Sequence, residues 1–311
     1  MILEDGYFLR AKGEGVREHC GVYVVVLFSC VCFGQTVDSP STQSLNSLIS
    51  RAEKNDAAAQ YSLGKTYVDG RDVPRDFGQA ARWYRKAADQ GYPEAENAVG
   101  FLYDNGQGVP QDHAEAARWY RKAADQGLAD ADLNLASLYD TGQGVPQDHA
   151  EAARWYRKAA EHGDPDAAFD LGVMYEDGQG VERDNTEAAH WYRRAAEQDI
   201  AVAQTALARL YANGRGVSRD PVEAVNWLRK AAERGFAPAL HDLGAAYADG
   251  RGVPQDYLEA YMWMDLAAFR ARGPLREQSS ADRGAMARKI TPEQAATADR
   301  RGLEWKKKWA P

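Results

Sequence analysis

Small and apolar residues recur along the chain in two alternating helical patterns, which together repeat every 36 residues. In the first pattern, Ala59, Leu63 and Tyr67 follow one another at intervals of four residues, so they lie on one face of a helix. In the second pattern, Ala80 and Trp83 begin a similar face. A fixed period of this length is typical of repeat arrays, in which each unit buries its apolar face against the next.

Six tryptophans set the register of the array, because each lies 36 residues after the one before it: Trp83, Trp119, Trp155, Trp191, Trp227 and Trp263. In this register six units follow one another: 56–91, 92–127, 128–163, 164–199, 200–235 and 236–271. Each unit contains both patterns with a Gly-rich turn between them, which predicts a helix-turn-helix and an all-α chain. Since the tryptophans share one position of the second helix, we interpret them as core packing.

Each unit also carries signals that shape its two helices. A Gly or Ala follows the large apolar residue of the first helix in every copy, and because Gly inside a helix costs about 1 kcal/mol relative to Ala, we expect a close approach of the partner helix there. These positions are Gly64, Gly100, Ala136, Gly172, Ala208 and Gly244. Every second helix opens with Asp and has Glu or Gln three residues later, as in Asp112 and Glu115, which predicts a capping box.

The helical pattern continues beyond both ends of the array, where the terminal units need to be covered. Residues 44–55 align with a second helix and predict an N-terminal capping helix with Asn55 as its left-handed end, preceded by a flexible leader over 35–43. Residues 272–311 predict a degenerate C-terminal helical pair and a basic tail, in which Thr291 and Pro292 start the last helix.

The first 34 residues differ from the rest of the chain. The apolar run 22–33 is too short to span a bilayer but suits a secretory signal, with small residues at Cys32 and Gly34 for cleavage before Gln35. The preceding segment is long and acidic for a signal, so a translation start nearer Val16 would fit better, and residues 27–30 faintly resemble a lipoprotein cleavage box. We expect 1–34 to be a signal peptide, giving a periplasmic or secreted protein without a membrane span after processing. Without a signal the protein would be cytoplasmic.

Composition narrows the chemistry of the repeats. The net charge of −8 argues against nucleic-acid binding, which depends on Lys and Arg contacts to phosphate. All three cysteines precede residue 35, so the repeats have no thiolate nucleophile or zinc–thiolate site. His113 and His149 are copies within a duplicated stretch, 106–124 and 142–160, and do not indicate a metal site. We find no nucleophile–base pair and expect no enzyme activity, cofactor or metal.

The repeat resembles the SEL-one-like repeat, a relative of the tetratricopeptide repeat. In the fourth unit the matching residues are Ala167, Leu171, Gly172, Tyr175, Gly178, Gly180, Val181, Asp184, Ala188, Trp191, Tyr192, Ala195 and Ala196. The resemblance covers about two-thirds of the chain and implies a right-handed α-solenoid, to which the flanking patterns add capping helices at both ends. It also implies an adaptor role and first helices that line a concave face. One secreted branch, associated with β-lactam binding or hydrolysis, pairs cysteines within each repeat, and these repeats have none.

Variable positions on the outward face of the first helices are the candidate binding site. In the central units this stripe combines apolar residues with acids, and apolar patches bordered by charge mark interaction sites. The predicted site comprises Asn97, Phe101, Asp104, Leu133, Ser137, Asp140, Phe169, Val173 and Glu176. We expect it to accept a peptide or helix with apolar anchors and basic flanks. The alternative is a solvated acidic face.

The sequence therefore favours a non-enzymatic scaffold or adaptor, exported from a bacterium, that regulates or assembles a protein partner. Two alternatives are a secreted hydrolase of the β-lactamase-like branch and an effector that binds a host protein. The tail from Lys306 to Trp309 is basic and aromatic and suggests a weak contact with a membrane or an acidic partner. The alternative for the tail is a solvated helix end that interacts favourably with the helix dipole.

Overall fold

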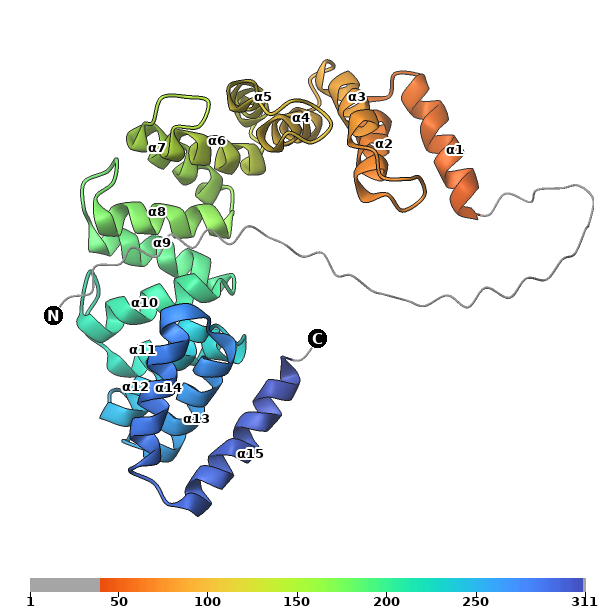
Figure 1. Cartoon of the computed structure of the whole chain (residues 1–311). Coiled ribbons are helices and arrows are strands. Elements are labelled where there is room, and N and C mark those ends of the chain that lie inside the picture. The colour runs from red at the N-terminus through yellow and green to blue at the C-terminus, as the bar shows by residue number, and fades with distance from the viewer. Residues whose placement is uncertain (1–39, 310–311) are drawn as a thin grey trace, which may run out of the picture. The chain divides into compact units, whose positions relative to one another are not determined.

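The computed structural model describes residues 40–309, with side chains from residue 44 onward. This part of the chain contains fifteen α-helices and no strand, which confirms the all-α prediction (Figure 1). The helices are α1 (Pro40–Glu53), α2 (Ala57–Asp69), α3 (Phe77–Ala88), α4 (Pro93–Asn105), α5 (His113–Asp125), α6 (Ala129–Thr141), α7 (His149–Glu161), α8 (Pro165–Asp177), α9 (Asn185–Glu197), α10 (Ala201–Asn213), α11 (Pro221–Glu233), α12 (Ala237–Asp249), α13 (Tyr257–Arg270), α14 (Gly273–Ala287) and α15 (Pro292–Lys308).

From α1 to α14 each helix packs on the next one along the chain, so the repeats form an α-solenoid. The even-numbered helices from α2 to α12 are the first helices of the six units, and the odd-numbered helices from α3 to α13 are the second helices. The small residue of the first helix does allow a close approach, as predicted. A Cβ placed on Gly100 would lie 2.7 Å from Cδ1 of Tyr120, and one on Gly172 would lie 2.6 Å from Cδ1 of Tyr192.

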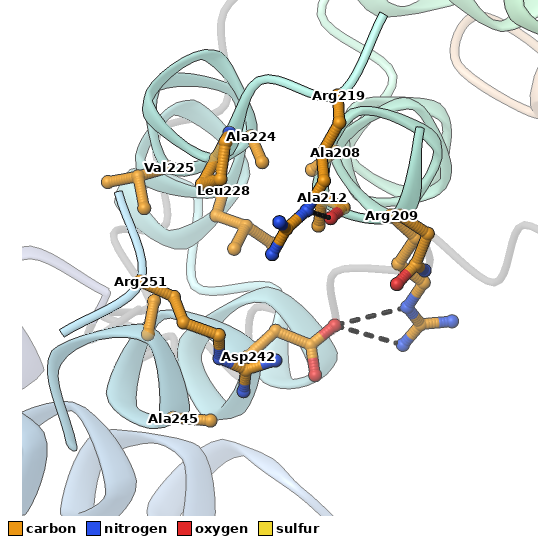
Figure 2. Close-up of a pocket in the computed structure, with 13 residues that line it drawn as sticks. Ala208, Arg209, Ala212, Arg219, Ala224, Val225, Leu228, Asp242, Ala245 and Arg251 are labelled. Carbon is orange, nitrogen blue, oxygen red and sulfur yellow. Dashed lines mark hydrogen bonds and ion pairs between the residues drawn. The ribbon is translucent and has the colours of Figure 1, made fainter. Parts of the chain in front are cut away.

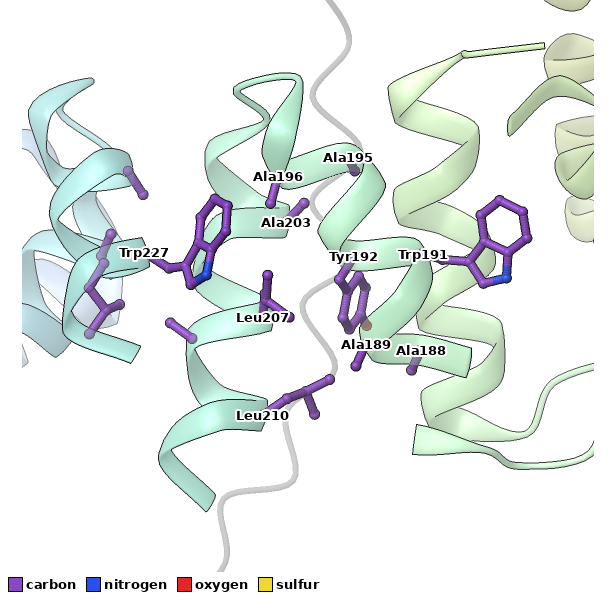
Figure 3. Packing of buried hydrophobic residues seen from close by; sticks show 14 of the residues in the cluster. Ala188, Ala189, Trp191, Tyr192, Ala195, Ala196, Ala203, Leu207, Leu210 and Trp227 are labelled. Carbon is purple, nitrogen blue, oxygen red and sulfur yellow. The ribbon is translucent and has the colours of Figure 1, made fainter. Parts of the chain in front are cut away.

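The tryptophans lie in the core between units. Four of them are buried, and Trp83 and Trp155 are half-buried. Figure 3 shows Trp191 and Trp227 projecting to the same side of their helices, near the small and aliphatic residues of one continuous cluster. Burying such large side chains in successive units gives the array much of its hydrophobic stabilisation.

The second helices are capped differently from the prediction. Each opening Asp accepts a hydrogen bond from the N3 backbone amide, as Asp112 does from Glu115 at 3.0 Å. The Glu side chain does not return to the cap, because the Asp112 amide already donates to the carbonyl of Tyr103 at 2.9 Å. Instead, Oε1 of Glu115 accepts from Nε1 of Trp119 at 2.9 Å. The capping-box prediction is therefore half wrong, since in the second, third, fourth and sixth units the third-position Glu accepts from the indole N–H instead.

Helices also extend the array at both ends. α1 begins at Pro40, so residues 40–43 are helical rather than a flexible leader, while residues 1–39 and the predicted signal peptide lie outside the described residues. Asn55 follows α1 with φ of 68°. At the other end α15 packs on α13, and Thr291 and Gln294 form a reciprocal capping box. Within residues 40–309 no helix has the length and apolar character needed to cross a bilayer.

Candidate interaction surface

The nine predicted site residues occupy equivalent positions on three first helices. Asn97, Phe101 and Asp104 lie on α4; Leu133, Ser137 and Asp140 lie on α6; and Phe169, Val173 and Glu176 lie on α8. A hydrogen bond of 3.1 Å from Nδ2 of Asn134 to Oδ1 of Asn97 joins α4 to α6. We call these nine residues the central first-helix surface.

The apolar residues of this surface differ in exposure. Phe101 has 48% of its surface exposed, an unusual fraction for a large apolar side chain in this array. Leu133, Phe169 and Val173 are half-buried and pack against the core, and the Phe169 ring lies 5.6 Å from the ring of Tyr192. Ser137 is buried. Of the four apolar residues on the predicted stripe, three are therefore only partly exposed, because they lie against neighbouring core side chains.

The acids of the surface are held by specific partners rather than freely solvated. Asp104 lies 2.7 Å from Nδ1 of His113, and Asp140 lies 2.8 Å from Nδ1 of His149. The duplicated histidines thus position acids at the end of the preceding helix.

Glu176 is bound differently, by residues of two units. Its carboxylate accepts a hydrogen bond of 2.9 Å from the hydroxyl of Tyr192 and pairs with Arg215 of the following unit at 3.2 Å. Burial raises the pKa of Tyr192, which keeps this hydroxyl a donor. The negative charge of Glu176 is therefore paired with Arg215 within the fold, so Glu176 contributes less to an acidic border than the sequence suggested.

A buried polar column beneath this surface escaped the sequence interpretation. Asp132 has no exposed surface; its Oδ1 accepts from Lys158 at 2.9 Å and its Oδ2 lies 3.4 Å from His162. Burial raises the pKa of Asp132, and the hydrogen bond and charge of Lys158 oppose that effect. Glu96, one unit earlier, is also buried and accepts from Gln126 at 2.6 Å. These contacts join the first helix of a unit to the second helix of the same unit or to the residues that end it, so we interpret them as structural.

The sequence interpretation also missed a pocket of about 470 Å³ between α10, α11 and α12. Its apolar lining includes Leu228 and Ala246, and three arginines and an aspartate contribute charge (Figure 2). Arg209 on α10 reaches Asp242 on α12, with Nε and Nη2 each 3.1 Å from Oδ2. The available signal was the loss of the usual Tyr at position 228.

Neither a metal centre nor a free tail emerges from the described residues. No group of three or more His, Cys, Asp or Glu side chains within them is arranged to hold a metal ion. In the C-terminal tail, Nζ of Lys306 lies 2.7 Å from Asp265, and Nε1 of Trp309 donates to the carbonyl of Glu233 at 3.0 Å. The Trp309 ring also lies 5.6 Å from that of Trp305. Much of the predicted contact surface of the tail is therefore occupied by the fold itself.

Comparison with known proteins agrees with this architecture. The model of a family described as Sel1 repeat matches residues 57–92, 93–128, 129–164, 165–200, 201–236 and 237–268. A protective antigen of uropathogenic Escherichia coli with an SLR fold is 37% identical, with a TM-score of 0.75 over 84% of this chain; the chain spans 56% of that structure. A Sel1 repeat protein from Oxalobacter formigenes is 33% identical, with a TM-score of 0.64 over 75% of this chain and 92% of its own. No curated protein matches the chain.

Proposed function

This chain belongs to the Sel1 repeat family, and from that premise we propose that its central first-helix surface binds a protein segment with apolar anchors and basic flanks. Sel1 repeat proteins are generally protein-interaction scaffolds and typically lack enzyme activity. The repeats therefore imply a protein partner. The proposal adds a position for that partner on α4, α6 and α8, and a preference for its chemistry.

The exposure of Phe101 is the observation that carries the proposal. An aromatic side chain left half in water at the middle of a helix gains stability when a partner covers it. Leu133, Phe169 and Val173 extend this apolar surface at its base, since each is partly exposed. Aromatic anchors near the centre of an interface supply a large share of binding energy in many complexes.

The acids determine which flanks the partner should have. Asp104 lies one turn of helix after Phe101, and Asp140 occupies the equivalent position on α6. Lysines or arginines beside the partner's anchor would approach these carboxylates. Such contacts speed association and favour one orientation, and they weaken as salt screens them.

A matched pair of phenylalanine substitutions tests the proposal. Phe101→Ser removes the anchor, and Phe269→Ser removes a phenylalanine of 56% exposure on α13, outside the surface. The probe is a fluorescent amphipathic peptide with leucine anchors and terminal lysines, titrated at about 50 and about 500 mM salt. We expect Phe101→Ser to weaken binding about tenfold and Phe269→Ser to leave it unchanged. Equal binding by wild type and both variants would remove this surface as the site.

We also propose that the protein is exported, since the apolar run 22–33 and the small residues before Gln35 have the pattern of a secretory signal. Mass spectrometry of the protein recovered from its native cells tests this directly. The expected mature chain begins at Gln35, in the periplasmic or secreted fraction. A cytoplasmic protein that retains residues 22–33 would contradict the proposal.

A further inference from the structure

The pocket between α10, α11 and α12 exists because the repeat pattern breaks at two positions that face one another. The second helices of the first four units carry Tyr at one position, and the fifth carries Leu228. At the position that Ala246 occupies in the sixth unit, the first helices of the second to fifth units carry Leu or Met: Leu102, Leu138, Met174 and Leu210. Both smaller side chains line the pocket, so the missing bulk leaves a space of about 470 Å³.

The same place in the preceding unit is filled, and it shows what the pocket lacks. There the ring of Tyr192 takes up the space, and the carboxylate of Glu176 binds both the Tyr192 hydroxyl at 2.9 Å and Arg215 at 3.2 Å. One unit later the tyrosine has become Leu228 and the glutamate has become Ala212, while the arginine is retained as Arg251. Compared with the preceding unit, the pocket therefore lacks an aromatic ring and a carboxylate but keeps the positive charge of Arg251.

The charges around the pocket favour an anionic group. Arg209, Arg219 and Arg251 line it against a single acid, Asp242, in a chain whose net charge is −8. Burial alone would raise the pKa of Asp242, but its hydrogen bond with His241 and the charge of Arg209 lower it, so it remains ionised and holds Arg209. Two arginines then remain for a ligand.

The positions of these two arginines suit a ligand inside the pocket. Nε of Arg219 donates to the carbonyl of Ala212 at 3.1 Å, and Figure 2 shows its guanidinium directed between Leu228 and Asp242. Arg251 pairs with Asp249 at 2.8 Å, where both side chains are more than half exposed. An exposed pair of this kind contributes little to stability, so Arg251 can exchange it for a ligand carboxylate.

We propose that this pocket binds a segment of a partner protein in which Asp or Glu adjoins an aromatic or bulky apolar residue, with the ring on Leu228 and the carboxylate on Arg251 and Arg219. The ligand would supply what Tyr192 and Glu176 supply within the preceding unit. This site is separate from the central first-helix surface. The proposal rests on the proposed scaffold role in one respect, which is that the ligand is a segment of a protein. The volume lies within the range of small-ligand pockets.

Three capped fluorescent peptides test the ligand chemistry. The first is Ser-Gly-Glu-Tyr-Gly-Ser; in the second Gln replaces Glu, and in the third Ala replaces Tyr. We expect the full-length protein to bind the first peptide at least about tenfold more tightly than either of the others, because charge-assisted contacts and ring burial both contribute. Binding of the first peptide should weaken as salt increases.

Substitutions that restore the repeat pattern test the position of the site. Leu228→Tyr refills the space. Ala208 and Leu228 of the fifth unit are equivalent to Ala136 and Tyr156 of the third unit, which already combines Ala with Tyr, so the variant is expected to fold. Ala212→Glu returns the internal acid to Arg251. Each should lower affinity for the first peptide at least about tenfold. Arg183→Gln is the control, because Arg183 corresponds to Arg219 one unit earlier and lies outside the pocket lining.

Several results would overturn the proposal. These are no binding of the first peptide at about 1 mM, equal binding of the glutamine peptide, or unchanged binding by folded Leu228→Tyr. Self-association that Leu228→Tyr abolishes would assign the pocket to a second copy of the chain instead. Phe101→Ser should leave this peptide bound, and Leu228→Tyr should leave the lysine-flanked peptide bound, so either proposal can fail without the other.

Discussion

Replacing Gly172 with Ala should destabilise the array, although Ala normally favours a helix. The substitution gains about 1 kcal/mol of helix propensity. Its Cβ would lie 2.6 Å from Cδ1 and 2.7 Å from Cε1 of Tyr192, well inside normal contact distance. Tyr192 is buried and its hydroxyl is bound to Glu176, so the ring cannot easily withdraw. Overpacking of this kind costs about 1–3 kcal/mol, which leaves a net loss of about 1 kcal/mol.

Two other helical glycines serve as matched controls for this prediction. A Cβ on Gly284 would meet nothing within 4 Å, and one on Gly302 would lie 3.8 Å from the Met262 side chain. Both Ala variants should therefore gain up to about 1 kcal/mol. Urea unfolding followed by circular dichroism, with hydrogen exchange of α8 and α9, measures the three changes. If Gly172→Ala were as stabilising as Gly284→Ala, the close approach of the partner helix would not explain why this position of each first helix carries Gly or Ala.

Three further predictions follow from contacts within the array. Glu187→Ala should lower the free energy of unfolding by about 1–2 kcal/mol, because it removes the carboxylate that accepts a 3.2 Å hydrogen bond from the buried Trp191 indole. Glu223→Ala should lower it less, since Nε1 of Trp227 has no hydrogen-bond partner to lose. Equal losses in urea unfolding would contradict this prediction. Burial raises the pKa of Asp132, although the hydrogen bond and charge of Lys158 oppose this effect. A raised pKa means that the folded protein binds a proton more readily than the unfolded chain does, so the free energy of unfolding should increase as the pH falls through the folded-state pKa toward the ordinary Asp value. Asp132→Asn should remove that part of the pH profile of unfolding, and an unchanged profile would exclude Asp132 as its source. Thr291→Ala should cost about 1 kcal/mol and increase hydrogen exchange at the start of α15, whereas unchanged exchange there would argue against the capping box.

The candidate site shows where sequence reasoning was limited. Helical spacing alone placed the predicted residues at equivalent positions of three first helices, because spacing determines which residues share a face of a helix. It could not predict how exposed each residue is. Phe101 and Val173 occupy equivalent positions of their units, yet Val173 packs against the core and Phe101 is 48% exposed. That difference depends on how neighbouring side chains from other helices fill the space, which no spacing rule describes.

The sequence by itself determined the helices, their order and their register, because period, glycine placement and cap residues act locally and repeat in every unit. It also predicted a close approach of the partner helix at the Gly or Ala position of each first helix, since a glycine inside a helix needs such a reason. Only the tertiary structure decided that Glu176 pairs with Arg215 of the next unit, whereas Glu115 takes Trp119 within its own helix. It alone revealed the pocket, because Leu228 and Ala246 lie on different helices and their lost volumes add up only where α11 packs on α12.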